Sequence, residues 1–264
     1  MTTAQARGNV AGLLLREWRQ RRRLSQLDLA NLATTSARHL SYLETGRSLP
    51  SREMVLRLSE ALEIPLRDRN QMLLGAGHAP AYDDSRIDMS AMRRLLDTLD
   101  LVLAAHDPWP ALVLDAHFDI VSSNDAVGRL LTLIDADLLD PPVNVVRVTL
   151  HPRGLSRYIT NLPQWRAHLL RQVRRHAAAV PSADLDQLLA EVEGFPVRSR
   201  EQEPSGPSFA LPLHLDVGGQ ALQLYSTVAT FGTPLDVVAS ELAIETFLPA
   251  DPATSAWLTG AAST

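Results

Sequence analysis

The pattern of hydrophobic and polar positions predicts five short helices in the first 79 residues. Apolar residues recur there at helical spacing, and capping or turn residues separate the segments. The expected helices cover residues 9–22, 25–33, 36–44, 52–62 and 66–75. Glycines, Pro80 and an acidic pair then predict a linker over residues 80–89. We therefore expect residues 1–79 to form an all-helical domain.

The second predicted helix carries a clear start signal. Ser25 can cap it, and Asp28 stands three residues later at the capping-box position. Its expected buried residues are Leu29, Leu32 and Ala33. The helix is short, and a tight turn follows it.

The third predicted helix leaves polar side chains free on its outer face. Ser36 can cap this helix, and Leu40 and Leu43 recur at i and i+3, which places both in the core. Two short helices around a tight turn are typical of a DNA-binding helix-turn-helix. The residues available to a base edge are Ala37, Arg38, His39, Ser41 and Tyr42.

This spacing resembles the helix-turn-helix of the Xre and phage-repressor family. There, Ser-Gln opens the second helix, Leu-Ala packs it, and Glu-x-Gly-Arg-x-x-Pro-Ser closes the third. The matching residues are Ser25, Gln26, Leu29, Ala30, Glu44, Gly46, Arg47, Pro50 and Ser51. One departure is Thr34, which stands where the family usually has Gly, so the turn is expected to bend differently or to carry strain.

The resemblance implies which residues contact DNA. Gln26 and Arg47 are expected at phosphates and Arg38 at a base, because the third helix of this family enters the major groove. The full predicted set is Ser25, Gln26, Ser36, Ala37, Arg38, His39, Ser41, Tyr42 and Arg47.

Charge separates the two parts of the chain. Residues 1–79 hold 12 arginines against 7 acidic residues, a net of +5, whereas residues 80–264 carry a net of −10. Arg19, Arg21, Arg22 and Arg23 form a basic cluster just before Ser25. The cluster either neutralises phosphates or is a solvated helix end. A basic N-terminal part, here called the head, followed by an acidic remainder, here called the body, favours double-stranded DNA as a partner.

The remainder of the chain mixes helical and strand periodicity. A helix over 88–105 is expected to pack against the second domain or against a twin helix in a homodimer. A strand pair over 111–115 and 118–124 leads into a helix over 124–133 that Asn124 can begin. Residues 144–150 favour a strand or an extended approach. The other predicted helices cover residues 162–179, 182–192 and 234–247, and a terminal segment ends at Trp257.

One hairpin is predicted down to its register. Gly218 and Gly219 supply the positive φ of a two-residue turn between two alternating segments. In that register Leu213 faces Leu224 and Leu215 faces Leu222, which gives one apolar face.

A second resemblance covers residues from about 90 to 258. PALVLD followed by Asn124, then NVVRVTLHP, then STVATFGTPLDVVASELAIETFLPAD are similar to the ligand-binding domain of MmyB-like transcription regulators. That resemblance implies a PAS-like domain over residues 90–264, with an antiparallel sheet and helices around a cavity, and in some members a fatty-acid-like ligand. The whole chain is then α+β.

Candidate ligand residues follow from the expected cavity, which needs apolar walls and a few polar anchors. The walls would be Trp109, Phe118, Trp165 and Phe231, and the anchors His117 and Asn144. The aromatic residues can equally be plain core, and Asn144 can simply cap a helix or pair with backbone. Arg147, Arg153 and Arg157 either hold a ligand carboxylate or form a solvated basic patch.

Other classes of function find little support in the sequence. The histidines form no His-x-x-x-His or His-x-His pair, and no GxSxG, P-loop or GxGxxG motif follows a predicted strand. We expect no catalytic residue, metal or cofactor. The chain has no cysteine and no long apolar run, so we expect a cytoplasmic protein that neither enters membranes nor needs disulfides.

The favoured interpretation is a bacterial-type transcription regulator. Its head would bind operator DNA as a homodimer, and its body would bind a small apolar or fatty-acid-like effector. One alternative is a DNA-binding adaptor or antitoxin-like module whose C-terminal domain docks a protein partner. The other is an enzyme with an appended regulatory head.

Overall fold

The computed structural model describes residues 3–84, 89–180, 182–196 and 210–260. The chain divides into two compact units. One contains residues 1–88 and 233–240, and the other contains residues 89–232 and 241–264. The predicted division into residues 1–79, 80–89 and 90–264 stays a prediction; in the structure, residues 233–240 group with the first unit. That segment joins the first unit because Val237 N donates to Asp83 O over 2.8 Å.

In the first unit, residues 3–84 form five helices, as predicted. They are α1 (Thr3–Arg21), α2 (Gln26–Leu32), α3 (Ala37–Glu44), α4 (Arg52–Ala61) and α5 (Leu66–Gly75). Side chains such as Leu29, Leu40 and Leu58 are completely buried in a continuous apolar core. Gly12 lets α1 approach α3, because a Cβ there would stand 2.4 Å from the carbonyl oxygen of Leu43.

Local signals fix the helix-turn-helix as expected. Ser25 and Asp28 form a complete capping box, and the Ser36 side chain accepts from the backbone N–H of His39. Thr34 adopts a φ of +50°, the left-handed conformation that favours the glycine it replaces. One expectation is wrong: Leu32 is 60% exposed, because α2 ends there and its buried side is completed by Ala33.

The second unit contains a five-stranded antiparallel sheet in the order β2-β1-β5-β4-β3. Its strands are β1 (Ala111–Leu114), β2 (Ile120–Ser123), β3 (Leu213–Val217), β4 (Gln220–Thr230) and β5 (Ala243–Pro249). The predicted hairpin register is confirmed, since Leu213 pairs with Leu224 and Leu215 with Leu222. Gly218 and Gly219 both have positive φ in its turn.

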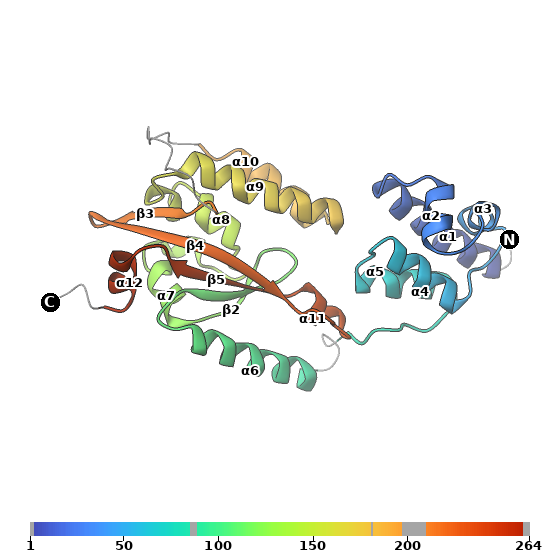
Figure 1. Cartoon of the computed structure of the whole chain (residues 1–264), viewed down its shortest axis with the longest axis horizontal. Helices are drawn as coiled ribbons and strands as arrows, with labels where there is room; N and C mark the ends of the chain where they lie inside the picture. Colours follow the sequence, from blue (N-terminus) through green and yellow to red (C-terminus); the bar gives the residue numbers. More distant parts are fainter. Residues whose placement is uncertain (1–2, 85–88, 181, 197–209, 261–264) are drawn as a thin grey trace. The chain divides into compact units, whose positions relative to one another are not determined.

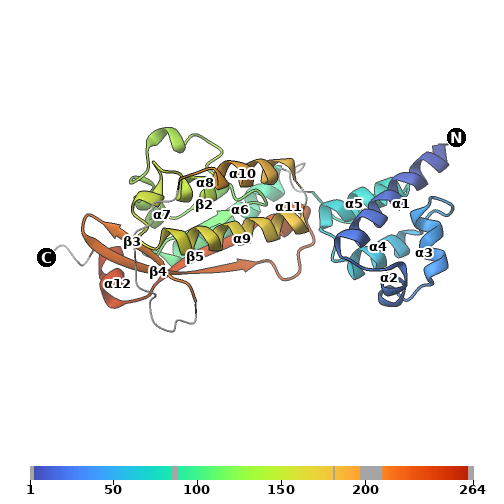
Figure 2. The ribbon, with the colours of Figure 1, turned by 90° about the horizontal axis from the view of Figure 1, so that it is seen from above.

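Helices cover the sheet on both sides (Figure 1). Those of this unit are α6 (Met89–His106), α7 (Asp125–Leu131), α8 (Val145–Leu150), α9 (Leu162–Ala179), α10 (Ala183–Glu193) and α12 (Pro252–Leu258). The short helix α11 (Val237–Glu241) belongs to the first unit except for its last residue. Figure 2 shows α9 and α10 running along one side of the sheet, whereas α6 packs against β1 and β2. The predicted α+β class is confirmed, and the PAS-like description stays a prediction.

Two segments differ from their predicted structure. Residues 145–150 form the α8 helix instead of a strand, because Asn144 caps them and Val146, Val148 and Leu150 are buried in the core around the helix. The expected helix over 234–247 ends at Glu241, and Ala243–Pro249 becomes β5. That strand is bonded to β1 on one edge and β4 on the other, so sheet pairing overrides the local helical pattern.

Candidate DNA-binding surface and ligand pocket

A buried carboxylate joins the three helices that position the recognition surface. Glu44, at the end of α3, is 5% exposed. Arg19 of α1 donates to both of its oxygens over 2.6 and 2.9 Å, and Gln26 of α2 donates to Oε2 over 2.9 Å. The fork of Arg19 around Glu44 also raises the pKa of the guanidinium. Gln26 is therefore held in place, with one N–H still free to bind a phosphate.

The exposed face of α3 gathers two arginines around one aromatic ring. Arg38 and Arg47 lie 5.5 and 6.0 Å from the centroid of Tyr42, and Arg38 Nε donates to the Tyr42 hydroxyl over 3.1 Å. Both arginines are exposed. This places two cations and a phenol at the surface where the third helix of a helix-turn-helix meets the major groove.

The other predicted DNA contacts lie around this cluster. Ser25 and Ser36 are exposed and are used as helix caps. Ala37, His39 and Ser41 are half-buried on α3. The structure thus brings the predicted set to one helix-turn-helix.

The basic cluster before α2 is largely occupied by protein partners. Arg21 pairs with Glu17 on the same helix. Arg22 donates to the carbonyl oxygens of Leu62 and Glu63 after α4, over 2.8 and 3.0 Å. Among the described residues, Arg23 has no such partner. The cluster therefore holds helices together, in addition to supplying positive charge.

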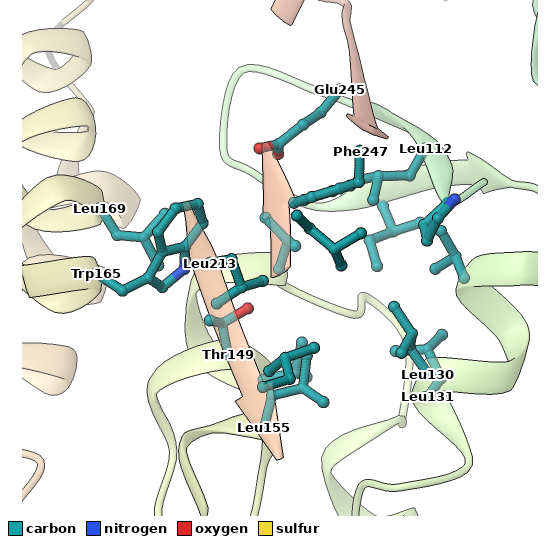
Figure 3. Close-up of a pocket in the computed structure, with 17 residues that line it drawn as sticks. Leu112, Leu130, Leu131, Thr149, Leu155, Trp165, Leu169, Leu213, Glu245 and Phe247 are labelled. Atoms are coloured by element: carbon teal, nitrogen blue, oxygen red, sulfur yellow. The ribbon is translucent and has the colours of Figure 1, made fainter. Parts of the chain in front are cut away.

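A cavity of about 60 Å³ lies within the second unit, between the sheet and helices α7, α8 and α9 (Figure 3). Its walls are almost entirely apolar, with Thr149 and Glu245 as the polar exceptions. The lining residues are Pro110, Leu112, Ile120, Val127, Leu130, Leu131, Val145, Val148, Thr149, Leu155, Trp165, Leu169, Leu213, Leu215, Leu224, Glu245 and Phe247.

One ionisable side chain, Glu245 of β5, lines the cavity. It is 8% exposed, and Ser226 of β4 donates its hydroxyl to Oε1 over 2.5 Å. Burial raises the pKa of the Glu245 carboxyl because the charged form is poorly solvated, while the Ser226 hydrogen bond partly opposes this rise.

Of the predicted ligand residues, only Trp165 lines this cavity. Trp109 packs edge-on against His106, and Phe231 is 39% exposed beyond the end of β4. His117 and Phe118 lie in the β1–β2 turn. Aromatic character was a poor guide because leucine and valine form most of the wall.

The other predicted anchor has a structural task. Asn144 caps α8, where its Oδ1 accepts from Arg147 N over 3.1 Å. Its Nδ2 donates to His117 O and to Asp119 Oδ1, both over 2.8 Å. These contacts fix the β1–β2 turn against α8 and leave Asn144 outside the cavity lining.

The three candidate carboxylate-binding arginines are all paired with acidic side chains. Arg147 donates one hydrogen bond to each carboxylate oxygen of Glu191, both over 2.8 Å. These hydrogen bonds raise the pKa of the Arg147 guanidinium. Arg153 binds Asp137 and Asp135, and Arg157 binds Asp135. Each therefore already has the partner that a ligand carboxylate would have to displace.

The described residues show neither a metal site nor a membrane-spanning helix. In the described part of the chain, no group of three or more His, Cys, Asp or Glu side chains could hold a metal ion. No described helix has the length and apolar character needed to cross a membrane.

Comparison with known families assigns both units. A family model described as the MmyB-like transcription regulator ligand binding domain matches residues 95–260, and a helix-turn-helix domain model matches residues 11–72. This chain belongs to the MmyB-like transcription regulators. The regulator is a DNA-binding transcription factor with a separate ligand-binding domain, as both sequence resemblances predicted.

Two solved structures of the clp gene regulator ClgR are similar to part of this regulator. One, from C. glutamicum, is 28% identical, with 27% of this chain and 88% of that chain covered and a TM-score of 0.24. The second, from Corynebacterium glutamicum, is 23% identical, with 38% and 94% covered and a TM-score of 0.24. No curated protein matches the regulator.

The sequence interpretation of this MmyB-like regulator missed Glu245 and Ser226. Both lie on strands β4 and β5, and Glu245 was assigned to a helix. The β-branched and aromatic residues Ile244, Thr246 and Phe247 are the signal that could have identified β5.

Proposed function

We propose that this MmyB-like regulator binds its operator through α3 and changes its DNA affinity when a small apolar effector enters the cavity. The observation that carries the proposal is an open apolar cavity inside the family's ligand-binding domain. A C-terminal domain that served only to dock a partner protein would need no internal cavity. The cavity therefore favours a small effector over the adaptor alternative.

An effector can act only by binding the DNA-competent and the incompetent states with different affinity. By linkage, DNA must then change the effector's affinity by the same factor. The effector should therefore change the affinity for the operator, and the operator should change the affinity for the effector.

We propose Arg38 as the base-reading side chain. It is an exposed arginine at the start of α3 and can make a bidentate contact with guanine. Its present hydrogen bond to Tyr42 keeps it on the outer face. Gln26, which Glu44 holds, would contact a phosphate, and Arg47 would add charge.

The proposed assembly is a homodimer on an inverted repeat. One short recognition helix reads too few base pairs for useful specificity, whereas two half-sites one helical turn apart suffice. The α6 helix is the candidate dimer interface, because its apolar residues Leu101 and Val102 are 72% and 45% exposed. Light scattering that gives a monomer both free and on DNA at micromolar concentration would rule the dimer out.

The DNA assignment is tested by fluorescence anisotropy on the operator recovered by genomic footprinting and on a random duplex. We expect Arg38→Ala to cost about 1 to 3 kcal/mol on the operator and much less on the random duplex. Gln26→Ala should weaken both. The matched control is Arg57→Ala, which removes an exposed arginine from α4. Equal losses on both duplexes for Arg38→Ala would overturn the assignment.

A further inference from the structure

The cavity contains no side chain that could neutralise an anion. Its lining holds one carboxyl, from Glu245, and no arginine, lysine or histidine. A bound carboxylate would thus be removed from water without a counter-charge, which is strongly unfavourable. The arginines considered for this task are paired with Glu191, Asp135 and Asp137.

Glu245 is a polar group with unused hydrogen-bonding capacity. Only one of its oxygens receives a hydrogen bond, from Ser226, and no other partner of the carboxyl occurs among the described residues. In Figure 3, Glu245 lies at one edge of the group of lining side chains. Leu130, Leu131 and Leu155 lie at the opposite edge. The second oxygen of this otherwise buried side chain has no hydrogen-bond partner among the described residues, so it can accept or share a hydrogen bond with the polar end of a ligand.

Resting on the proposed effector role, we propose that the cavity takes an uncharged apolar molecule that ends in a hydroxyl group, and that Glu245 selects this head group. A hydroxyl both donates and accepts, so it can bond to the free oxygen of Glu245 without bringing a charge into the cavity. A carboxylate would lack a counter-ion. An ammonium group would have to be stripped of water, and one carboxyl in an apolar wall supplies too few hydrogen bonds to offset that cost.

The size of the cavity sets the length of the ligand. A single water molecule needs about 10 to 15 Å³ of such free volume, so the cavity of about 60 Å³ accommodates roughly four to six groups the size of a water molecule. This corresponds to most of a six- to eight-carbon chain. Octyl compounds are therefore suitable probes.

The test is calorimetric titration of the full chain at pH 7.5 with 1-octanol, octanoate and octylamine, which differ in their head group. We expect 1-octanol to bind at least about tenfold more tightly than either charged compound. Octanoate or octylamine binding as tightly as 1-octanol would overturn the inference and leave the effector role intact. If no member of the series binds, the effector role fails together with the inference.

Two variants test the role of Glu245 itself. Glu245→Gln keeps a side chain that donates and accepts, so its affinity for 1-octanol should stay within about threefold of the parent. Glu245→Leu removes the carboxyl partner of the hydroxyl and should weaken binding about tenfold, equivalent to about 1.4 kcal/mol. Equal affinity of the Gln and Leu variants would show that Glu245 does not select the ligand. Circular dichroism checks their folding, and the octyl series on the parent chain needs neither variant.

Discussion

Two buried glutamates distinguish the DNA-binding unit from the ligand-binding unit. Glu44 and Glu245 are 5% and 8% exposed, so burial alone does not separate them. Glu44 receives hydrogen bonds from both Arg19 and Gln26, whereas Glu245 receives one from Ser226. The first lies in a filled core and fixes three helices, and the second lines a cavity. The hydrogen-bond partners, more than the burial, indicate which carboxyl is free to bind a ligand.

The largest effect is expected from Glu44→Ala. This change leaves Arg19 without its carboxylate in a site where that side chain is 12% exposed. We expect a loss of about 3 to 5 kcal/mol in the free energy of unfolding of the first unit, measured by urea titration of the helical circular dichroism signal. The matched control is Glu17→Ala, whose exposed pair with Arg21 should be worth less than about 1 kcal/mol. Similar losses in both variants would mean that Glu44 does not organise the helices.

The filled core and the cavity should respond differently to an added ring. Leu40 has no exposed surface and packs in the first unit, so Leu40→Trp should cost about 1 to 3 kcal/mol or more through overpacking. Leu224→Trp places the same added volume beside the cavity and should cost less than about 1 kcal/mol. Thermal unfolding of the two variants measures this difference. A larger loss for Leu224→Trp would show that the second unit is packed shut.

The smallest effect concerns pH. Because the folded pKa of Glu245 is raised above its ordinary value of 4.5, the unfolded chain loses this proton first as pH rises. The free energy of unfolding should therefore fall as pH rises from 4.5 to the raised pKa of Glu245 in the folded protein. The Glu245→Gln variant should lack this pH dependence. We expect the variant to become more stable relative to the parent as pH rises above 4.5, measured by urea unfolding at several pH values. A difference that does not change with pH would contradict a poorly partnered carboxyl.

Local chemistry made the helix-turn-helix predictable. The capping box of Ser25 and Asp28 lies within four residues, and Thr34 shows in the structure the strained φ that its place in the turn implied. The Gly218–Gly219 turn likewise fixed the register of its hairpin, because a two-residue turn leaves little freedom to its strands.

The ligand pocket depends on contacts between distant parts of the chain and was largely missed. Glu245 meets Ser226 only because β5 lies between β1 and β4, a pairing that no local pattern determines. Asn144 was expected at the ligand and instead caps α8. Of the aromatic residues chosen as walls, Trp165 alone lines the cavity. Periodicity locates apolar faces, but which of them enclose a space is decided by tertiary packing.

The most direct test is the affinity of the full chain for its operator with and without saturating 1-octanol, measured by fluorescence anisotropy. Leu224→Trp, with its cavity filled, serves as the control. The account predicts a change of at least about fivefold in the parent and none in the filled variant, because coupling requires the ligand to bind in the cavity. Unchanged operator affinity in the parent when calorimetry shows 1-octanol bound, or an equal change in the filled variant, would contradict it.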